Sequence, residues 1–351
     1  MKKITLLLIA TMLLFTCACS QGPDLESVSG GYIKAGEEKL TPEYVLRIGD
    51  KKIGFDQYRY FFLNVADSMV YQQDAQTFWT DEKITELKNQ VEDYLLKAYA
   101  LEKYAEKNSL TLTADEKNTV NSYVDDIINN MGKEEFKENM DTLYLTEKLY
   151  RSLQADEAVY EKIYTKLFGE GGEMAWSDEE FDAYYAENYI CATHVLISFT
   201  AGEKPDNCPV TYKKAQDVLA LTATEDFDDL IEKYGNDAEL ERYPTGYYFT
   251  EGGMVKEFYD AAKALKVGEI SDIVVTSAGC HIIKRLEPDK EQIALQKDAI
   301  LNGSSSSDGS YKPGIYADLF EEFYTKLTDE YKSQLTYNSE VEEYLKPGLV
   351  F

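Results

Sequence analysis

Apolar residues recur with the three- and four-residue spacing of a helix over much of the first half of the chain. The clearest stripe consists of Ile84, Leu87, Val91, Tyr94, Ala98 and Leu101. Thr113 with Glu116, and Ser177 with Glu180, have the spacing of helix-capping boxes and indicate two further helix starts. We therefore predict a mainly helical region over residues 43–190.

The pattern changes after residue 190, where β-type runs alternate with amphipathic segments. The runs predict strands at 192–198, 273–276 and 281–286, and helices at 212–223, 227–234 and 255–265. Strands and helices mixed within about 100 residues predict a compact α/β module over 191–288. Four consecutive serines, 304–307, indicate a linker over 289–314, followed by a helix within 315–351. The predicted fold class is α+β, with the α/β module inserted in or appended to a mainly α-helical domain.

Composition narrows the possible functions. The chain has 351 residues and a formal charge of −28, from 64 Asp and Glu against 36 Lys and Arg. Binding to a phosphate backbone requires clustered cations, so we expect no nucleic-acid partner. With only two histidines and five cysteines, a zinc site of several His and Cys ligands is poorly supported, and no dinucleotide or phosphate-binding glycine motif follows a strand. We expect neither a metal nor a cofactor.

The N-terminus has the pattern of an export signal. Two lysines precede an apolar run at 4–15, which is too short to span a bilayer, and small residues and cysteines follow. The segment resembles a bacterial lipoprotein signal over 1–18, with Cys19 as the lipidated residue because Ala18 precedes it. Cys17 and an ordinary cleaved signal are the alternatives. Residues 19–42, rich in Gly, Ser and Glu, are predicted to form a flexible stalk between a lipid-anchored end and the folded part.

Both histidines fall on predicted strands of the α/β module, His194 in the first and His281 at the start of the last. The module resembles the parvulins, the PpiC-type peptidyl-prolyl isomerases, over about residues 190–288. The resemblance is carried by residues 193–197 (THVLI), 226–230 (DFDDL), 234–237 (YGND), 253–258 (GMVKEF), 261–265 (AAKAL), 268–271 (GEIS) and 277–284 (SAGCHIIK).

The resemblance implies a set of site residues. In parvulins two buried histidines lie beneath the active site, beside a threonine and an acid or thiol, and apolar residues line a proline pocket. These roles would fall to His194 and His281, Thr276, Asp237, and the pocket residues Met254 and Phe258. The histidines and Asp237 also have simpler explanations: core histidines that are merely hydrogen-bonded, and a solvated loop carboxylate.

The resemblance further implies isomerisation of Xaa-Pro bonds. That reaction is slow because twisting the bond breaks amide resonance, and a pocket that prefers the twisted amide accelerates it without a nucleophile. The chain departs from the family at residues 243–249 (YPTGYYF), where parvulins carry a glycine-rich turn and a pocket leucine. An inactive, peptide-binding parvulin fold is therefore the alternative.

The whole arrangement resembles the PrsA-type foldase lipoproteins of Gram-positive bacteria and, in general plan, the periplasmic chaperone SurA. By that resemblance the helix within 315–351 would pack with the N-terminal helices of 43–190 as one chaperone region. The protein would be lipid-anchored at the outer face of the bacterial membrane. Its partners would be unfolded exported polypeptides, held by the helical region and isomerised by the module. The alternative from a different class is a non-catalytic chaperone or peptide-binding surface lipoprotein.

Overall fold

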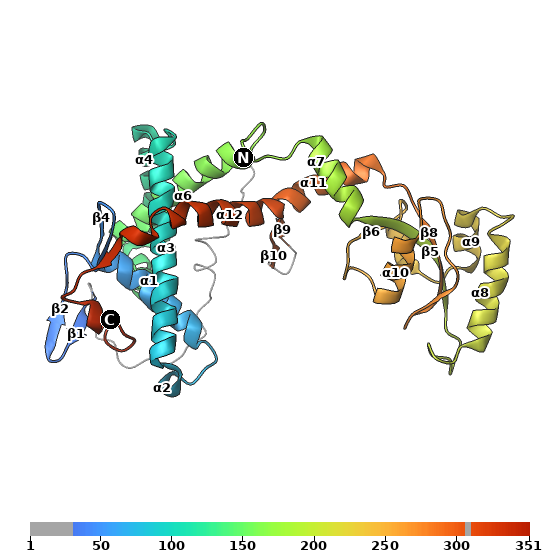
Figure 1. Cartoon of the computed structure of the whole chain (residues 1–351), viewed down its shortest axis with the longest axis horizontal. Coiled ribbons are helices and arrows are strands. Elements are labelled where there is room, and N and C mark those ends of the chain that lie inside the picture. Colours follow the sequence, from blue (N-terminus) through green and yellow to red (C-terminus); the bar gives the residue numbers. More distant parts are fainter. Residues whose placement is uncertain (1–30, 306–309) are drawn as a thin grey trace. The chain divides into compact units, whose positions relative to one another are not determined.

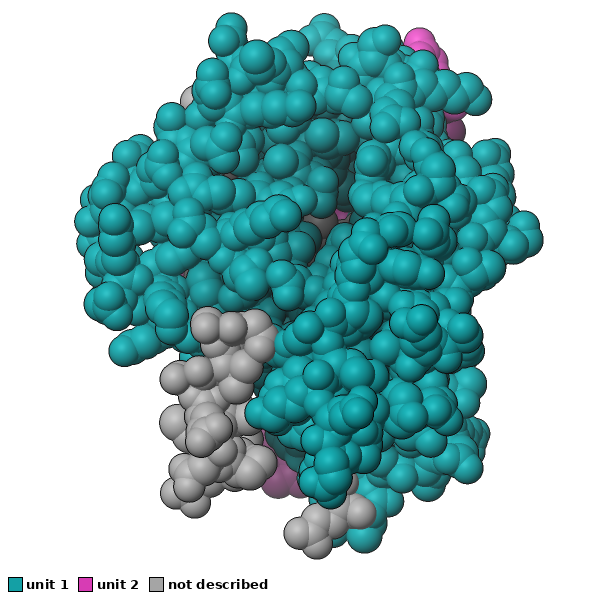
Figure 2. Space-filling model, turned by 90° about the vertical axis from the view of Figure 1, so that its left-hand side faces the viewer, with its two compact units in different colours: residues 1–175, 316–351 teal, residues 176–315 magenta. Residues whose placement is uncertain are grey.

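The computed structural model describes residues 31–305 and 310–351, so the predicted signal at 1–18 and Cys19 lie outside the described residues. The chain divides into two compact units, coloured separately in Figure 2. Unit 1 consists of the chain up to Ala175 together with Tyr316–Phe351, and unit 2 is Trp176–Ile315. No helix in the described residues is long and apolar enough to cross a membrane.

Unit 1 is mainly helical with small sheets at its edge (Figure 1). Its elements are β1 (Ile33–Ala35), β2 (Glu38–Leu40), β3 (Leu46–Ile48), β4 (Lys51–Ile53), α1 (Phe55–Val70), α2 (Ala75–Phe78), α3 (Asp81–Lys107), α4 (Ala114–Met131), α5 (Lys133–Thr142), α6 (Glu147–Phe168), α12 (Ile315–Asp329), η3 (Lys332–Gln334), β11 (Leu335–Tyr337) and η4 (Glu342–Tyr344). The predicted capping box that starts α4 is confirmed at Thr113 and Glu116.

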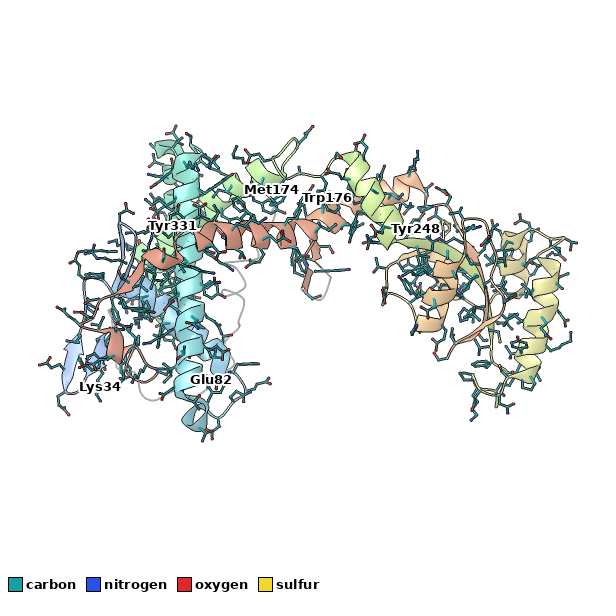
Figure 3. All side chains as sticks on the ribbon, in the orientation of Figure 1. Lys34, Glu82, Met174, Trp176, Tyr248 and Tyr331 are labelled. Atoms are coloured by element: carbon teal, nitrogen blue, oxygen red, sulfur yellow. The ribbon has the colours of Figure 1, made fainter. Side chains whose placement is uncertain are left out.

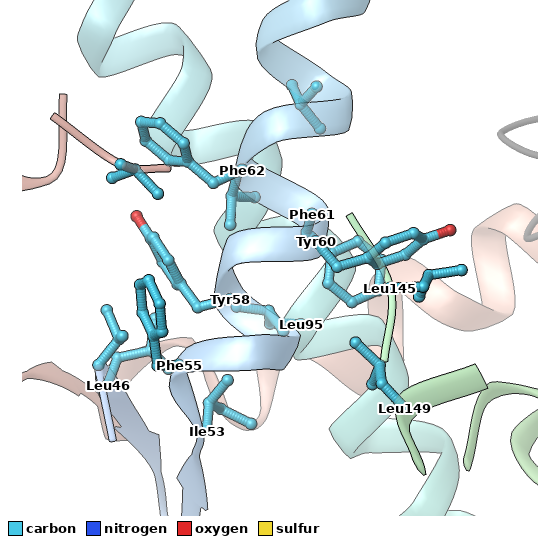
Figure 4. Close-up of a cluster of buried hydrophobic side chains, with 14 of the residues drawn as sticks. Leu46, Ile53, Phe55, Tyr58, Tyr60, Phe61, Phe62, Leu95, Leu145 and Leu149 are labelled. Carbon is cyan, nitrogen blue, oxygen red and sulfur yellow. The ribbon is translucent and has the colours of Figure 1, made fainter. Parts of the chain in front are cut away.

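The core of unit 1 forms around α1 and α3. Phe55, Tyr58 and Phe62 lie on one face of α1 and pack with buried residues of β3, β4 and α3, including Leu95 (Figure 4). The predicted stripe at 84–101 lies on α3, where Leu87 and Val91 are fully buried. The amphipathic spacing read from the sequence thus corresponds to a helix face that contacts the core.

The C-terminal segment belongs to the same unit. Tyr316 and Phe320 of α12 pack against α6, with ring centroids 4.7 Å from Phe168 and 4.8 Å from Tyr160 respectively. Farther along, β11 pairs with β3, which also pairs with β4, to complete a three-stranded antiparallel sheet. Residues separated by almost 300 positions therefore share one core.

The prediction of a flexible stalk over 19–42 is wrong for its last part. Residues 33–40 form an antiparallel hairpin, β1 with β2, and Ile33 is completely buried. The backbone of Tyr32 exchanges two hydrogen bonds of 3.0 Å with that of Phe351, and the two rings stack at 5.1 Å. Composition alone suggested a linker because these long-range backbone pairings leave no mark in local sequence.

Unit 2 contains a four-stranded antiparallel sheet in the order β6-β5-β8-β7. Its elements are α7 (Asp178–Asn188), β5 (Ile190–Ser198), α8 (Pro209–Leu221), α9 (Phe227–Tyr234), η2 (Ala238–Arg242), β6 (Tyr247–Phe249), α10 (Lys256–Ala264), β7 (Val274–Val275), β8 (Gly279–Arg285), α11 (Lys290–Asn302), β9 (Ser304–Ser305) and β10 (Tyr311–Lys312).

Both faces of this sheet are covered. Val195, Ile197 and Ile282 share a core with α8 and α9, whereas Ala192 and Ile283 share a second core with α10. Helices on both faces explain why β5 is buried along almost its whole length. Alternate residues of β5 and β8 face the α10 side, and His194 and His281 are among them.

Two predicted boundaries need correction. Residues 289–314, predicted as a linker, contain α11 and the β9–β10 hairpin, because Asp289 caps the helix by accepting hydrogen bonds from two backbone N–H groups. Leu301 is the only buried residue of α11, so the apolar spacing of this helix gave little signal. The helical region predicted over 43–190 ends earlier: α7, which begins at the predicted capping box of Ser177, belongs to unit 2.

Candidate functional site

The two histidines meet on the α10 face of the sheet. In the register of β5 and β8, His194 lies opposite Ile283 and Leu196 lies opposite His281, which makes the histidines diagonal neighbours. Their Nδ1 atoms are 2.9 Å apart and the side chains are only 4% and 5% exposed. Gly279 begins β8 with φ +150°, where a side chain would collide with the carbonyl oxygen of Ile197.

Asp237 closes one end of this histidine pair. It caps η2 by accepting a hydrogen bond from Glu239 N at 3.0 Å, and its Oδ2 lies 2.8 Å from His194 Nε2. The hydroxyl of Tyr247, on β6, donates to the same oxygen at 2.8 Å. The Asp237 side chain is 18% exposed, so it is the member of the network through which solvent reaches the site.

Thr276 closes the other end. Its hydroxyl lies 2.8 Å from His281 Nε2 and accepts a hydrogen bond from the backbone N–H of Ala278 at 3.1 Å. The threonine is 3% exposed, so its hydroxyl has no access to bulk water as an alternative partner. A continuous chain of hydrogen bonds therefore runs from Ala278 N–H through both imidazoles to Asp237.

The direction of this chain follows from the ionised carboxylate. A carboxylate only accepts, so His194 Nε2 carries a proton and its Nδ1, when the ring is neutral, accepts. His281 Nδ1–H is then the donor between the rings, which leaves His281 Nε2 to accept from the hydroxyl of Thr276. This assignment satisfies every polar atom of the chain.

The pKa directions agree with these protonation states. Burial lowers the pKa of His194 despite its bond to Asp237, and burial together with His194 lowers the pKa of His281 to about 4. Burial by itself would raise the pKa of Asp237, but hydrogen bonds from His194, Tyr247 and Glu239 N–H outweigh it and lower the pKa. At neutral pH both rings are neutral and the carboxyl group is ionised.

The two predicted pocket residues lie in different surroundings. The Phe258 ring, on α10, is 2% exposed and meets both imidazoles edge-on, with centroids 5.2 Å from His194 and 5.4 Å from His281. Met254 is half-buried and packs against the same apolar cluster. Phe258 thus supports the histidines from the core, and Met254 offers apolar surface at the rim.

Tyr247 is the site residue that the sequence analysis did not identify. The turn at 243–249 was recognised only as a departure from the parvulin pattern. Its last three residues form β6, which pairs with β5; Tyr248, the middle residue of β6, is labelled in Figure 3. The aromatic run after Gly246 was the available signal for a strand. Tyr243, 48% exposed, lies beside Tyr247 with ring centroids 5.1 Å apart and the rings tilted by 47°, so aromatic rings border Asp237.

The described part of the chain has no group of three or more His, Cys, Asp or Glu side chains arranged to hold a metal ion. The site therefore consists of a neutral histidine pair, one buried threonine, one ionised carboxylate and an apolar and aromatic border. Such a site lacks an activated nucleophile, and it is suited to binding and polarising a substrate rather than to covalent chemistry.

Comparisons with known proteins point to the same module. The family model of the PPIC-type PPIase domain matches residues 182–289. Foldase protein PrsA of Geobacillus kaustophilus is 36% identical over 121 residues, which are 33% of this chain and 38% of that protein. Peptidyl-prolyl cis-trans isomerase Pin1 of Digitalis lanata is 33% identical over 111 residues, which are 27% of this chain and 94% of that protein.

A further relative extends beyond the module. Foldase protein PrsA of Caldanaerobacter subterraneus is 27% identical over 260 residues, 71% of this chain and 74% of that protein. By contrast, the chain spans little more than a third of the length of the more similar PrsA relatives.

The histidine protonation states are open to direct measurement, because the chain has only two histidines. Nitrogen-15 NMR at pH 7 should show His194 protonated on Nε2 and His281 on Nδ1, and titration should give a midpoint near 4 for His281. Thr276→Val, which removes the partner of His281 Nε2, assigns the two signals. A proton on His194 Nδ1, or a His281 midpoint above about 6, close to a free imidazole, contradicts the proposed direction.

Removal of the Tyr247 hydroxyl should weaken the hold on ionised Asp237. We expect Tyr247→Phe to lower the free energy of unfolding of unit 2 by about 1–2 kcal/mol at pH 7. Urea unfolding measures the loss. The difference from wild type should shrink as pH falls through the lowered pKa of Asp237, because protonation removes the charged acceptor.

Tyr243→Phe is the matched control for this experiment, since Tyr243 lies beside Tyr247 and is about half exposed. It should change the unfolding free energy by less than about 0.5 kcal/mol. Equal losses in the two variants would show that the bond to Asp237 adds no stability.

Proposed function

This chain belongs to the parvulin family of PPIC-type peptidyl-prolyl isomerases, and we propose that it is an extracytoplasmic foldase that isomerises Xaa-Pro bonds in exported proteins. The observation that carries the proposal is the uninterrupted hydrogen-bond chain from Thr276 through both histidines to Asp237, inside the matched domain. Each of its members was expected at the site from the sequence.

The proposed mechanism lowers the barrier by binding the twisted amide better than the planar one. A planar Xaa-Pro amide is polar through resonance. Rotation about its C–N bond breaks that resonance and confines the lone pair to the nitrogen, so the twisted amide is less polar. Apolar surface at Met254 would hold the proline ring, while the ionised carboxylate of Asp237 acts on the rotating carbonyl through its field. No covalent intermediate is needed.

The histidines have an architectural role in this proposal. Neutral and buried, they connect Thr276 to Asp237 through hydrogen bonds and so fix the position of the carboxylate. Phe258 packs edge-on to both rings. They are positioning residues, whereas Asp237 and Met254 are proposed to contact the substrate. Tyr247 holds Asp237 in place and borders the substrate site.

Unit 1 is proposed to hold the polypeptide whose prolines unit 2 isomerises. Support comes from the PrsA relatives, which are named foldases, and from the alignment with one of them over 71% of this chain. A foldase acts on chains that are not yet folded, so the proposed partners are unfolded exported polypeptides. The acidic composition, 64 Asp and Glu in 351 residues, favours cationic segments of such partners.

One observation favours the second candidate, an inactive parvulin fold that only binds peptide. Phe258, expected to line the proline pocket, is 2% exposed, and the altered turn at 243–249, which leaves the family's pocket leucine without a clear counterpart, places Tyr247 beside Asp237. The pocket then depends on Met254 and the tyrosine border.

The decisive measurement is the cis-to-trans rate of short Xaa-Pro peptides with the chain from Ser20 onward. Met254→Ala removes about 60 Å² of apolar contact, which at about 25 cal/mol per Å² lowers kcat/KM roughly tenfold. Asp237→Asn should also lower kcat/KM, because a neutral amide lacks the carboxylate field. Suppression of aggregation of a denatured protein should persist in both variants.

Val255→Ala is the matched control, since Val255 neighbours Met254 but is 50% exposed, and its rate should equal that of wild type. If the folded wild-type protein accelerates no peptide but still suppresses aggregation, the inactive alternative replaces the isomerase. If Met254→Ala loses both isomerisation and suppression of aggregation, the proposed assignment of holding to unit 1 and isomerisation to unit 2 is wrong.

Attachment to the outer face of the membrane through a lipid on Cys19 is also proposed. It is supported by the signal-like sequence at 1–18 and by the PrsA relatives. Cells that express the chain with labelled palmitate should incorporate label into wild type but not into Cys19→Ala. Incorporation that is lost only in Cys17→Ala would move the anchor to Cys17, and no incorporation at all would contradict the anchor.

A further inference from the structure

Unit 1 contains a groove of about 1020 Å³ along one face of α3. Its lining consists of Glu82, Thr85, Glu86, Asn89, Gln90, Asp93, Tyr94 and Lys97 of α3, with Glu321 of α12. The lining positions on α3 recur every three or four residues, so the groove follows a single helix face over 15 positions. At 1.5 Å per residue its length is about 22 Å (α3 is upright in Figure 3, with Glu82 labelled in its first turn).

The groove carries a net negative charge. Its lining has four carboxylates and one lysine, and that lysine is already paired: Lys97 Nζ lies 3.2 Å from Asp93 and 2.6 Å from Glu321. Glu82 has no ion-pair partner among the described residues, and Glu86 is paired only with exposed Lys83 at 2.7 Å. An exposed pair of this kind is weak, so both glutamates remain available to a cation.

The remaining lining suits a polypeptide backbone. Asn89 and Gln90 provide amide groups that donate and accept without regard to sequence, and the hydroxyl of Thr85, which donates to Asp81 O at 2.8 Å, can still accept. Tyr94 stacks on Phe61 at 5.7 Å, so one face of its ring is covered by the core and the residue borders the groove from its floor. Aromatic surface beside carboxylates accommodates both the stem and the charge of a long cationic side chain.

The dimensions match an extended chain. A strand rises about 3.3 Å per residue, so about seven residues fill a groove of 22 Å. Glu82 and Glu86 are about 6 Å apart along the helix axis, close to the roughly 6.6 Å between side chains on one side of a strand. Lysines two positions apart in an extended peptide would therefore meet both glutamates.

We propose that the α3 groove binds an extended segment of unfolded polypeptide that carries Lys or Arg at alternate positions. This rests on the proposed function, because it names the place and the chemistry by which unit 1 holds its partner. The site is separate from the histidine network of unit 2 and binds without a proline. It makes cationic, proline-free segments the preferred contact of the holding activity.

The test uses fluorescence anisotropy of the full chain with the labelled peptide Gly-Ser-Lys-Ala-Lys-Ser-Gly, which contains no proline. We expect binding that weakens with salt, and a Kd about three- to tenfold higher in Glu82→Gln/Glu86→Gln. A peptide with both lysines replaced by glutamine should bind the wild type as weakly as the lysine peptide binds that variant.

Because the whole chain carries −28, the variant needs a control of equal charge. Glu134→Gln/Glu138→Gln on α5 has the same four-residue spacing, starts in the first helical turn as Glu82 does, and changes exposed side chains. Its Kd should rise by less than about twofold. Equal weakening in the two double variants, or no binding to wild type, overturns the proposal.

Two further outcomes separate this inference from others. If sedimentation shows a dimer that only Glu82→Gln/Glu86→Gln dissociates, the groove is an interface between copies of this chain and the proposal is wrong. The rate on Xaa-Pro peptides should be unchanged in both double variants. If the lysine peptide binds as expected but the protein accelerates no Xaa-Pro peptide, the groove proposal stands and the proposed isomerase activity is wrong. If the protein accelerates Xaa-Pro peptides but the lysine peptide does not bind as expected, the isomerase proposal stands and the groove proposal is wrong.

Discussion

Two buried imidazoles that face each other through the same ring nitrogen have room for only one proton between them, and this constraint organises unit 2. Since Nδ1 of His194 and Nδ1 of His281 are 2.9 Å apart, one ring must donate and the other accept. The ionised Asp237 decides which, and the choice is passed on to Thr276 and the Ala278 amide. If one group of this hydrogen-bond chain lost its partner, it would become a buried polar group without a hydrogen bond. The loop that contains η2, the strand β6 and the turn before β8 are therefore all held in one arrangement.

The sheet makes this arrangement possible because it is buried on both faces. The cores formed with α8 and α9 on one side and with α10 on the other fix the register of β5 against β8, and the register brings the histidines together. Phe258 contributes from the α10 core rather than from an open pocket. Rigidity of this kind suits a site whose proposed work is to prefer one shape of an amide over another, because a pliable site would accommodate both shapes.

Unit 1 combines a core from both ends of the chain with a strongly acidic surface. The aromatic row on α12 packs against α6, and β11 pairs with β3, so the C-terminal segment is bound to a helix and a strand from much earlier in the chain. Net charge keeps such a protein soluble, but where the carboxylates line the α3 groove they also define a class of partner. In the proposed function, binding and isomerisation would use different physical interactions: charge and backbone hydrogen bonds in unit 1, and apolar shape with a fixed carboxylate in unit 2.

Local sequence determined a great deal of this protein. Periodicity and capping identified α3, α4 and α7, and the order of short motifs around His194 and His281 identified the parvulin module together with Asp237 and Thr276. Such features are set by neighbours within a few residues. Tertiary structure alone decided that residues 33–40 form a hairpin bonded to the last residues of the chain, that Tyr247 reaches Asp237, and that Phe258 is buried beneath the histidines. Each of these depends on contacts between distant segments, whose free energy comes from burial and pairing that no local pattern records.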